Sequence, residues 1–423
     1  MRKALYRIAM LSVHTCPLAA LGGKETGGMN VYVRELSREL ARRGMAVDIF
    51  TRSQNPRVPR IDDIELGEGA RVIHVKAGPE EPYHKNLVWN HLPEFVAGVR
   101  RFAQEEGLAY NLLHSHYWLS GWVACELQRD WPVPIVHMFH TLGRMKDLVA
   151  RSQAEREIVQ RIEVETEIMA FADRIVAATS RDKAHMVDLY GADPDKIVVI
   201  PCGVDLELFQ QMPCQEAKAE LGVPGDHHLV LFVGRIEPLK GVDTLIRAMA
   251  LMLEREPDWR GRVSLCIIGG DVSEDPALMD EELRCLQALR DELGIADVVI
   301  FAGAQAQETL PCYYSAADVV VVPSHYESFG MVALEAMACG APVIASDVGG
   351  LSFLVEDGRT GFLVPEKDPP ALADKLHLLL SDHAQRDLMG IAGTQVARHY
   401  GWPLIADQIV ALYDELLGVR VKT

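Results

Sequence analysis

The sequence predicts an α/β protein built from two doubly wound domains. The chain has 423 residues, which exceeds one ordinary domain, and apolar residues make up 49% of it, enough for two cores. Short apolar runs alternate with helical patterns along the chain, and this alternation indicates parallel sheets with helices on both faces. The order of strand, glycine turn and helix occurs near the start and begins again near residue 229, which indicates a second domain of the same kind.

The first domain is expected to span residues 1–205. Basic residues before the apolar run Ile8–Val13 resemble those of a signal peptide, but His14 breaks the run, which is also too short to cross a membrane. It is therefore interpreted as the first strand. A helix from about Asn30 to Gly44 follows, and Val47–Thr51 completes a strand–helix–strand unit. The further strands expected here are Val72–Val75, Leu112–Ser115, Ile135–Met138, Ile175–Ala178 and Ile197–Ile200.

A linker is expected over residues 206–225, because this segment is polar and contains prolines. The second domain then spans residues 226–400. Its expected strands are Leu229–Val233, Val263–Ile268, Val298–Phe301, Val319–Val322 and Val343–Ala345. The final helix, Pro403–Leu417, has one apolar face and is expected to pack back across the domain junction, which joins residues 401–423 to the first domain.

Composition excludes several classes of partner. Lys and Arg number 42 against 60 Asp and Glu, and the net charge of −18 argues against nucleic acid and anionic membranes as partners. The eight cysteines form no Cys-x-x-Cys pair, so neither a disulfide framework nor a zinc site is indicated. Because no apolar run approaches spanning length, we expect a soluble protein without an integral membrane segment, in the reducing cytoplasm.

Two glutamates separated by seven residues are the strongest functional signal. Glu327 falls in a loop after the apolar run Val319–Val322, Gly330 opens a helix, and Glu335 lies about one turn into that helix. Two carboxylates at the carboxyl end of a strand, beside helix N–H groups, suit a ligand that carries both hydroxyls and negative charge. A nucleotide sugar is such a ligand.

The two carboxylates are expected to have different partners. Glu335 is placed to accept hydrogen bonds from two ribose hydroxyls, and Glu327 from hydroxyls of the sugar. The N–H groups of Phe329, Gly330 and Met331 should face the ligand. The alternative for Glu335 is that it only complements the helix dipole.

The segment Gly234–Gly241 predicts a diphosphate site. Arg235 offers a planar fork for phosphate oxygens and Lys240 a compact charge, and both precede a helix whose N-terminus adds its dipole. No metal is required for such a site, and no cofactor is expected. The alternative is a solvated turn with incidental cations. A dinucleotide oxidoreductase is disfavoured because no clean G-x-G-x-x-G is followed by an acidic residue at the right offset.

In the first domain, a glycine pair and a set of histidines mark the candidate site. Gly27 and Gly28 precede the helix that contains Asn30, and their backbone can approach a ligand closely. Four histidines end two neighbouring strands, and we select His140 as the functional one. The four are His114, His116, His137 and His140. Trp118 is assigned to the core, and the Asp-Pro-Asp sequence at residues 193–195 to a turn rather than to a metal site.

Cations of the first domain are candidates for a second anionic group, an acceptor phosphate. They are Lys85, Arg144, Lys146 and Arg161. The alternative for each of them, taken alone, is an ordinary charged residue on the protein surface.

With these residues assembled, the chain resembles the retaining family 4 glycosyltransferases. The residues that carry the resemblance are Val233–Arg235, Lys240–Gly241, the Glu327 and Glu335 pair, Pro201–Asp205 and Glu356–Gly361. The resemblance implies the GT-B fold, in which two Rossmann-like domains face a cleft. It also implies a UDP-sugar donor and attack on the same face of the sugar, without a double-displacement nucleophile.

Two branches of that family share features with this chain. Ser12–Thr15, Gly27–Tyr32, Ala77–Pro79 and His114–Gly121 are similar to the inositol-phosphate N-acetylglucosaminyltransferases. In that branch, the positions matching Lys85, Tyr117, Thr141 and Arg161 hold the acceptor phosphate. Leu142–Lys146 instead resembles sucrose-phosphate synthases, which use fructose 6-phosphate. Both branches imply a UDP-sugar donor and a sugar- or inositol-phosphate acceptor.

The sequence therefore predicts a retaining hexosyltransferase. The residues expected in catalysis are Arg235, Lys240, His140 and Glu327. Those expected to bind the donor are Gly28, Arg235, Lys240, Glu327, Phe329, Gly330, Met331 and Glu335. Those expected to bind the acceptor are Asn30, Lys85, Tyr117, Thr141, Arg144, Lys146 and Arg161. A sucrose-phosphate synthase, a UDP-sugar epimerase and a non-catalytic nucleotide-sugar binder are the alternatives, and a homodimer is left open.

Overall fold

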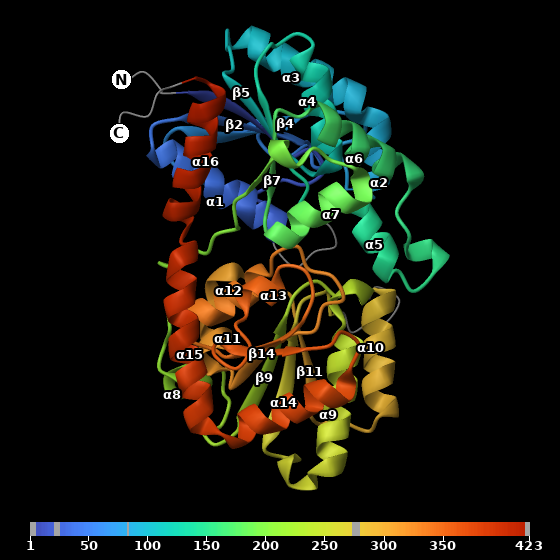
Figure 1. Ribbon diagram of the computed structural model, residues 1–423, viewed down its shortest axis with the longest axis vertical. Coiled ribbons are helices and arrows are strands. Elements are labelled where there is room, and N and C mark those ends of the chain that lie inside the picture. The colour runs from blue at the N-terminus through green and yellow to red at the C-terminus, as the bar shows by residue number, and fades with distance from the viewer. Residues whose placement is uncertain (1–5, 21–25, 83, 273–279, 419–423) are drawn as a thin grey trace. The chain divides into compact units, whose positions relative to one another are not determined.

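The structure is a computed structural model that describes residues 6–20, 26–82, 84–272 and 280–418 (Figure 1). The chain forms two compact units. Unit 1 consists mainly of Gly28–Pro201, together with the first strand and the C-terminal segment from Trp402. Unit 2 consists mainly of Cys202–Gly401.

Unit 1 contains an eight-stranded sheet in the order β3-β4-β2-β1-β5-β6-β7-β8. All neighbouring strands are parallel except β3, which pairs antiparallel with β4. The strands are β1 Arg7–Leu11, β2 Ala46–Arg52, β3 Ile61–Asp62, β4 Ala70–Val75, β5 Leu112–His116, β6 Ile135–Met138, β7 Arg174–Ala177 and β8 Ile197–Val199. The seven strands expected from the sequence are present, and the two-residue β3 is the addition.

Helices cover both faces of this sheet, as Figure 1 shows. The α-helices are α1 Gly28–Arg42, α2 Lys85–Val88, α3 Leu92–Glu105, α4 Tyr117–Gln128, α5 Gly143–Val149, α6 Val159–Phe171, α7 Ser180–Tyr190 and α16 Trp402–Leu416, and the 3₁₀ turns are η1 Trp89–His91, η2 Gln153–Glu155 and η3 Pro194–Lys196. Helix α16 lies beside α1 in this unit, where the Arg43 guanidinium donates 2.8 Å to Asp407 and 2.7 Å to the Pro403 carbonyl. Trp118 is fully buried, and Asp193 caps η3, as predicted.

Unit 2 contains a six-stranded, fully parallel sheet in the order β11-β10-β9-β12-β13-β14. The strands are β9 His228–Val233, β10 Val263–Ile268, β11 Val299–Gly303, β12 Val319–Val322, β13 Val343–Ser346 and β14 Gly361–Val364. The strand order reverses between β9 and β12, and in unit 1 between β1 and β5. Ligands of doubly wound sheets bind at the carboxyl ends of the strands at such reversals, so a ligand site is expected at these ends.

The helices of unit 2 are α8 Cys214–Glu220, α9 Val242–Arg255, α10 Glu281–Glu292, α11 Leu310–Ala316, α12 Met331–Ala338, α13 Leu351–Leu354, α14 Pro369–Ser381 and α15 His383–Ala397, with 3₁₀ turns η4 Pro238–Lys240, η5 Pro257–Trp259, η6 Gln307–Thr309 and η7 Arg398–Tyr400. None of the described helices is long and apolar enough to cross a membrane.

The segment 206–225, expected to be a linker, instead contains α8 and belongs to unit 2. Ala217 is fully buried, and the buried amine of Lys218 lies 2.8 Å from the Asp318 carboxylate. The sequence did not indicate this helix because its most buried polar residue is a lysine. A lysine is normally a surface residue, and its burial is expected only once its partner is known.

Candidate functional site

Two residues at the carboxyl ends of adjacent strands in unit 1 hold a strained backbone. Tyr117 follows β5 with φ of 73°, and His140 lies two residues beyond β6 with φ of 62°. Only one other non-glycine residue in the described part of the chain has positive φ. Such a conformation costs on the order of 1–3 kcal/mol and concentrates at functional sites. The strained backbone at Tyr117 and His140 therefore makes this edge of the sheet a candidate functional site.

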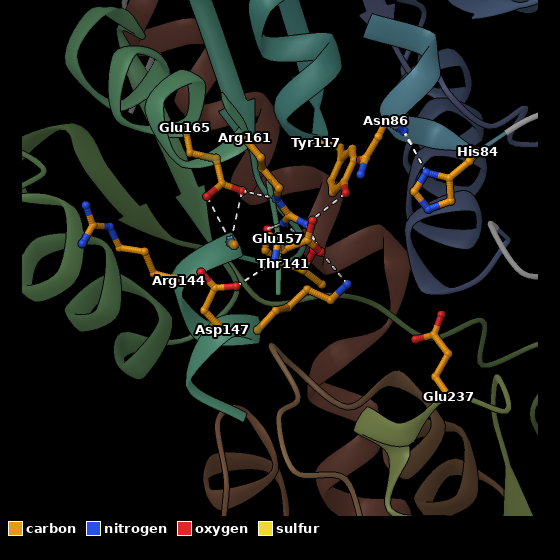
Figure 2. Close-up of polar contacts among 12 residues, drawn as sticks. His84, Asn86, Tyr117, Thr141, Arg144, Asp147, Glu157, Arg161, Glu165 and Glu237 are labelled. Atoms are coloured by element: carbon orange, nitrogen blue, oxygen red, sulfur yellow. Dashed lines mark hydrogen bonds and ion pairs between the residues drawn. The ribbon is translucent and has the colours of Figure 1, made fainter. Parts of the chain in front are cut away.

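The guanidinium of Arg161, on α6, is the centre of a buried polar cluster at this edge (Figure 2). Its Nε lies 2.7 Å from Glu165, its Nη1 3.0 Å from the Tyr117 hydroxyl, and its Nη2 2.8 Å from the Thr141 carbonyl and 3.1 Å from the Thr141 hydroxyl. Nη1 also forms an ion pair of 2.8 Å with Glu157. The side chain of Arg161 is fully buried.

Both carboxylates of this cluster balance buried positive charge. Glu165 is fully buried and accepts hydrogen bonds from the Gly143 N–H and the Tyr190 hydroxyl as well as from Arg161. Glu157 pairs with Lys146 at 2.9 Å. Burial favours the neutral acid at Glu157, but the charges of Arg161 and Lys146 and the hydrogen bond from Lys146 outweigh it, and the pKa of Glu157 falls to about 2.

The pKa of Glu157 predicts how stability depends on pH. Its folded pKa of about 2 lies below the ordinary value of 4.5, so its contribution is complete above pH 4.5 and is lost as the pH falls toward 2. The shift corresponds to a contribution on the order of 3 kcal/mol. Urea unfolding of the wild type and Glu157→Gln should therefore differ at pH 7 and converge as the pH is lowered from 5 to 3. A difference that stays constant over this range would contradict the prediction.

The structure brings together four of the residues expected to bind the acceptor, and it separates others. Tyr117, Thr141, Lys146 and Arg161 lie in one cluster. The charge of Lys85 also lowers the pKa of Glu157, so this lysine acts on the same group.

Two residues predicted for the acceptor have other partners. The exposed Arg144 points away from the cluster, and its guanidinium lies 5.2 Å from the ring centre of Tyr190 (Figure 2). The amide of the buried Asn30 donates to the Thr15 hydroxyl and the Cys16 carbonyl, at 2.8 and 2.7 Å, so it holds the loop that follows β1.

Of the four histidines singled out by the sequence, three are fully buried and His140 is half-buried. The Nε2 of His140 lies 2.9 Å from the Nδ1 of His116, and burial lowers the pKa of His140 to about 3. At neutral pH this imidazole is uncharged, and it can exchange hydrogen bonds without adding charge.

In unit 2, the expected donor residues lie in loops at the strand reversal. Lys240 ends η4 and Glu327 follows β12, and the Lys240 amine lies 2.6 Å from the Glu327 carboxylate. Arg235 follows β9 and pairs with Glu237 at 2.7 Å. Gly241, with φ of 65°, brings this turn against β12, since a Cβ there would lie 2.1 Å from the Pro323 carbonyl oxygen.

The backbone around Glu327 is fixed by a second close approach. The Gly350 N–H donates 2.9 Å to the Glu327 carbonyl, and a Cβ on Gly349 would lie 1.7 Å from that oxygen. Phe329 is buried, Gly330 is the N-cap of α12, and the half-buried Met331 is its first residue. The first N–H groups of a helix have no intrahelical acceptor, which leaves them available to an anion.

Glu335 is buried inside unit 2 rather than displayed on a helix surface. Its carboxylate accepts a hydrogen bond of 2.9 Å from the Tyr314 hydroxyl on α11. Burial and the neighbouring carboxylate raise the pKa of Tyr314 well above its ordinary value, so the phenol stays protonated and donates. Glu335 is the fifth residue of α12, beyond the first turn in which a carboxylate interacts strongly with the helix dipole.

Tyr314→Phe should loosen this carboxylate. Loss of the donor costs about 1–3 kcal/mol of stability because the buried acceptor loses a partner. If Glu335 binds the donor, the KM for the nucleotide sugar should rise several-fold while the KM for the acceptor stays unchanged. Steady-state kinetics and urea unfolding check both. A stability loss with unchanged kinetics would leave Glu335 a structural role.

The sequence interpretation missed four partners of the predicted residues, namely Glu157, Glu165, Tyr190 and Tyr314. A signal for two of them was present, since Glu157, Arg161 and Glu165 are spaced by four residues. Opposite charges at this spacing lie on one face of a helix, as Arg161 and Glu165 do on α6, whereas Glu157 precedes that helix. The tyrosines come from other elements, and no local pattern connects them to the site.

Comparison with known proteins gives consistent matches over nearly the whole chain. Residues 26–208 match the family described as Glycosyltransferase Family 4, and residues 214–396 match Glycosyl transferases group 1. The D-inositol 3-phosphate glycosyltransferase of Kineococcus radiotolerans is 43% identical over 99% of this chain and 97% of its own. That of Thermomonospora curvata is 42% identical over 96% and 95%. The structure of sucrose-phosphate synthase from Thermosynechococcus elongatus has 38% identity and a TM-score of 0.89, covering 98% of this chain and 100% of that one.

Proposed function

Because this chain belongs to the glycosyltransferases, with a family 4 domain followed by a group 1 domain, we propose that it transfers a hexose from a UDP-sugar to a phosphorylated polyol or sugar. Inositol 3-phosphate is the acceptor we favour, since the relatives of that name match at 40–43% identity over nearly their whole length. The observation that carries the proposal is the Arg161 cluster, which gathers Tyr117 and Thr141 around one buried guanidinium.

The acceptor half of the proposal rests on unit 1. Arg161 and Lys146 are cations held side by side through one carboxylate, and Lys85 adds charge in their neighbourhood. A planar guanidinium with a nearby ammonium suits a phosphate group, because it offers several donors and cancels its charge. The uncharged His140, at the strained end of β6, is proposed to hold a hydroxyl of the acceptor.

The donor half rests on unit 2. We assign the diphosphate to Arg235, Lys240 and the N-terminus of α12, the ribose to Glu335, and the transferred sugar to Glu327. Negative charge grows on the departing diphosphate during transfer, and fixed cations are most effective where charge develops. Neither a metal ion nor another cofactor is part of this proposal.

We propose that transfer retains the configuration of the sugar, because the chain has a family 4 domain and family 4 was expected to be retaining. The carboxylate of Glu327 is paired with Lys240 at 2.6 Å, which ties it to the diphosphate-binding residue and suits a ligand of the sugar hydroxyls. We therefore propose same-face attack by the acceptor hydroxyl, with the leaving diphosphate taking part in its deprotonation, rather than a covalent sugar–enzyme intermediate. The free cysteines of the chain fit a reducing cytoplasm as the compartment.

A matrix of donors and acceptors tests the function. UDP-glucose and UDP-N-acetylglucosamine are each incubated with inositol 3-phosphate, fructose 6-phosphate, and unphosphorylated inositol and fructose, with UDP release and product mass as readouts. We expect transfer to inositol 3-phosphate and little to inositol. Equal turnover with phosphorylated and unphosphorylated acceptors would refute the acceptor assignment, and UDP-sugar epimerisation without an acceptor would refute transfer.

Sucrose-phosphate synthesis is the second candidate. It is favoured by the likeness to the synthase structure, which extends over both units, and by the segment Leu142–Lys146. In the matrix, it predicts that fructose 6-phosphate with UDP-glucose gives the highest rate. Within this segment, Lys146 belongs to the Arg161 cluster, whereas the exposed Arg144 lies over the ring of Tyr190.

A further inference from the structure

The donors of Arg161 are fully engaged inside the chain. A guanidinium has five N–H groups. In the structure Nε binds Glu165, Nη1 reaches Tyr117 and Glu157, and Nη2 reaches the carbonyl and hydroxyl of Thr141. An incoming phosphate therefore has to replace one of these partners before it can bind this arginine.

Glu157 is the partner placed where a phosphate oxygen would bind. Its Oε1 lies 2.8 Å from Nη1 of Arg161 and 2.9 Å from Nζ of Lys146. One carboxylate oxygen thus bridges the two cations, as a phosphate oxygen does in an arginine–lysine site. The carboxylate of Glu157 stands in for the anionic group of a ligand.

The other carboxylate is locked in place. Glu165 is fully buried, and it receives hydrogen bonds from Arg161, the Gly143 N–H and the Tyr190 hydroxyl. Glu157 instead precedes α6 in an irregular segment, and its own N–H donates 2.7 Å to Asp147. Its side chain can turn away with less disruption than that of Glu165, because no helix turn depends on it.

The charges of the cluster agree with a displacement. With Glu157 in place, Arg161 pairs with Glu157 and Glu165, Lys146 pairs with Glu157, and the charge of Lys85 also acts on Glu157. When Glu157 leaves, Arg161 keeps Glu165 but Lys146 loses the carboxylate it is paired with, and a phosphate dianion can neutralise the positive charge that is left. A phosphate entering beside an unmoved Glu157 would instead meet its repulsion at close range.

We infer that Glu157 is a specificity-determining residue, which occupies the anion position of the acceptor site and leaves it when the phosphate of the acceptor binds. The inference rests on the proposed function, since it names the residue that controls the same site. Its consequence is selectivity for phosphorylated acceptors. An acceptor without phosphate leaves Glu157 paired with Arg161 and Lys146, whereas the phosphate of an acceptor can replace the Glu157 carboxylate as the partner of both cations.

Binding of orthophosphate and inositol 3-phosphate to the wild type, Glu157→Gln and Glu157→Ala tests this. Calorimetric titration should show about tenfold tighter orthophosphate binding to both variants than to the wild type, because no carboxylate competes. The KM for inositol 3-phosphate should fall relative to the wild type, with the KM for the UDP-sugar unchanged. Orthophosphate should also raise the Tm of the variants more than that of the wild type.

Glu155→Gln is the matched control. It removes one negative charge from the same segment, where Glu155 pairs with Arg151 at 3.0 Å, and it should leave orthophosphate affinity unchanged. Unchanged or weaker orthophosphate binding by folded Glu157→Gln and Glu157→Ala, in a wild type that glycosylates inositol 3-phosphate, would overturn the inference alone. A wild type that uses no phosphorylated acceptor would overturn the proposed function, whatever the variants bind.

Discussion

Lys240→Ala should lower kcat by about 10²–10³-fold, the loss found when one fixed group that stabilises transition-state charge is removed. Lys240 is the last residue of η4, and its amine lies 2.6 Å from the carboxylate of Glu327, which is expected to bind the donor. If it stabilises the departing diphosphate, its removal acts on the chemical step more than on binding. Stability should change by about 1 kcal/mol or less, because the pair is partly exposed.

Steady-state rates and urea unfolding of the same preparations separate the two effects. Lys375→Ala is the matched control, since it removes a lysine from unit 2 that lies 4.1 Å from the ring centre of Phe362 and has no proposed part in the reaction. Glu327→Gln distinguishes the diphosphate role from simple support of the glutamate. If it lowers kcat as much as Lys240→Ala and the double variant loses nothing more, the lysine acts through Glu327. A Lys240→Ala variant with wild-type turnover would contradict the assignment of Lys240 to the diphosphate.

The fold, and the positions of the residues expected to bind the donor, were predictable because their signals are local. A buried parallel strand such as β12 is a continuous apolar run, Val319–Val322, and the glycine that opens α12 follows it in the sequence. Arg235 and Lys240 fall between a strand end and a helix start, and such positions are defined by a few neighbouring residues. The same reasoning failed for α8, where the stabilising partner of Lys218 is Asp318, one hundred residues away.

The Arg161 cluster was only half predictable, for the same physical reason. The sequence identified Arg161 and Lys146 as cations, but it could not show that Glu157 holds them together. It also treated Arg144 as equivalent to them, although that side chain lies over the ring of Tyr190 from another helix. Charge is visible in a sequence, whereas the partner that neutralises it depends on the tertiary fold, and the partner decides whether a cation is available to a ligand.

Arg161→Ala should destabilise the protein by about 3–5 kcal/mol, the cost of leaving buried carboxylates without their cation. Arg161 is fully buried and binds both Glu157 and Glu165, so its loss affects two charges rather than one. Turnover with phosphorylated acceptors should also be lost at temperatures where the variant stays folded. Urea unfolding and acceptor kinetics measure the two effects separately.

Arg144→Ala supplies the comparison, because it removes a nearby arginine whose guanidinium lies over Tyr190 instead of binding Tyr117 and Thr141 as Arg161 does. The side chain of Arg144 is exposed, and its loss should cost about 1 kcal/mol or less. If Arg144 binds the acceptor, as its position in the sequence suggested, Arg144→Ala would raise the acceptor KM as strongly as Arg161→Ala does. We expect the opposite order, since a phosphate needs donors that converge on one point, and in unit 1 such convergence occurs at the buried Arg161.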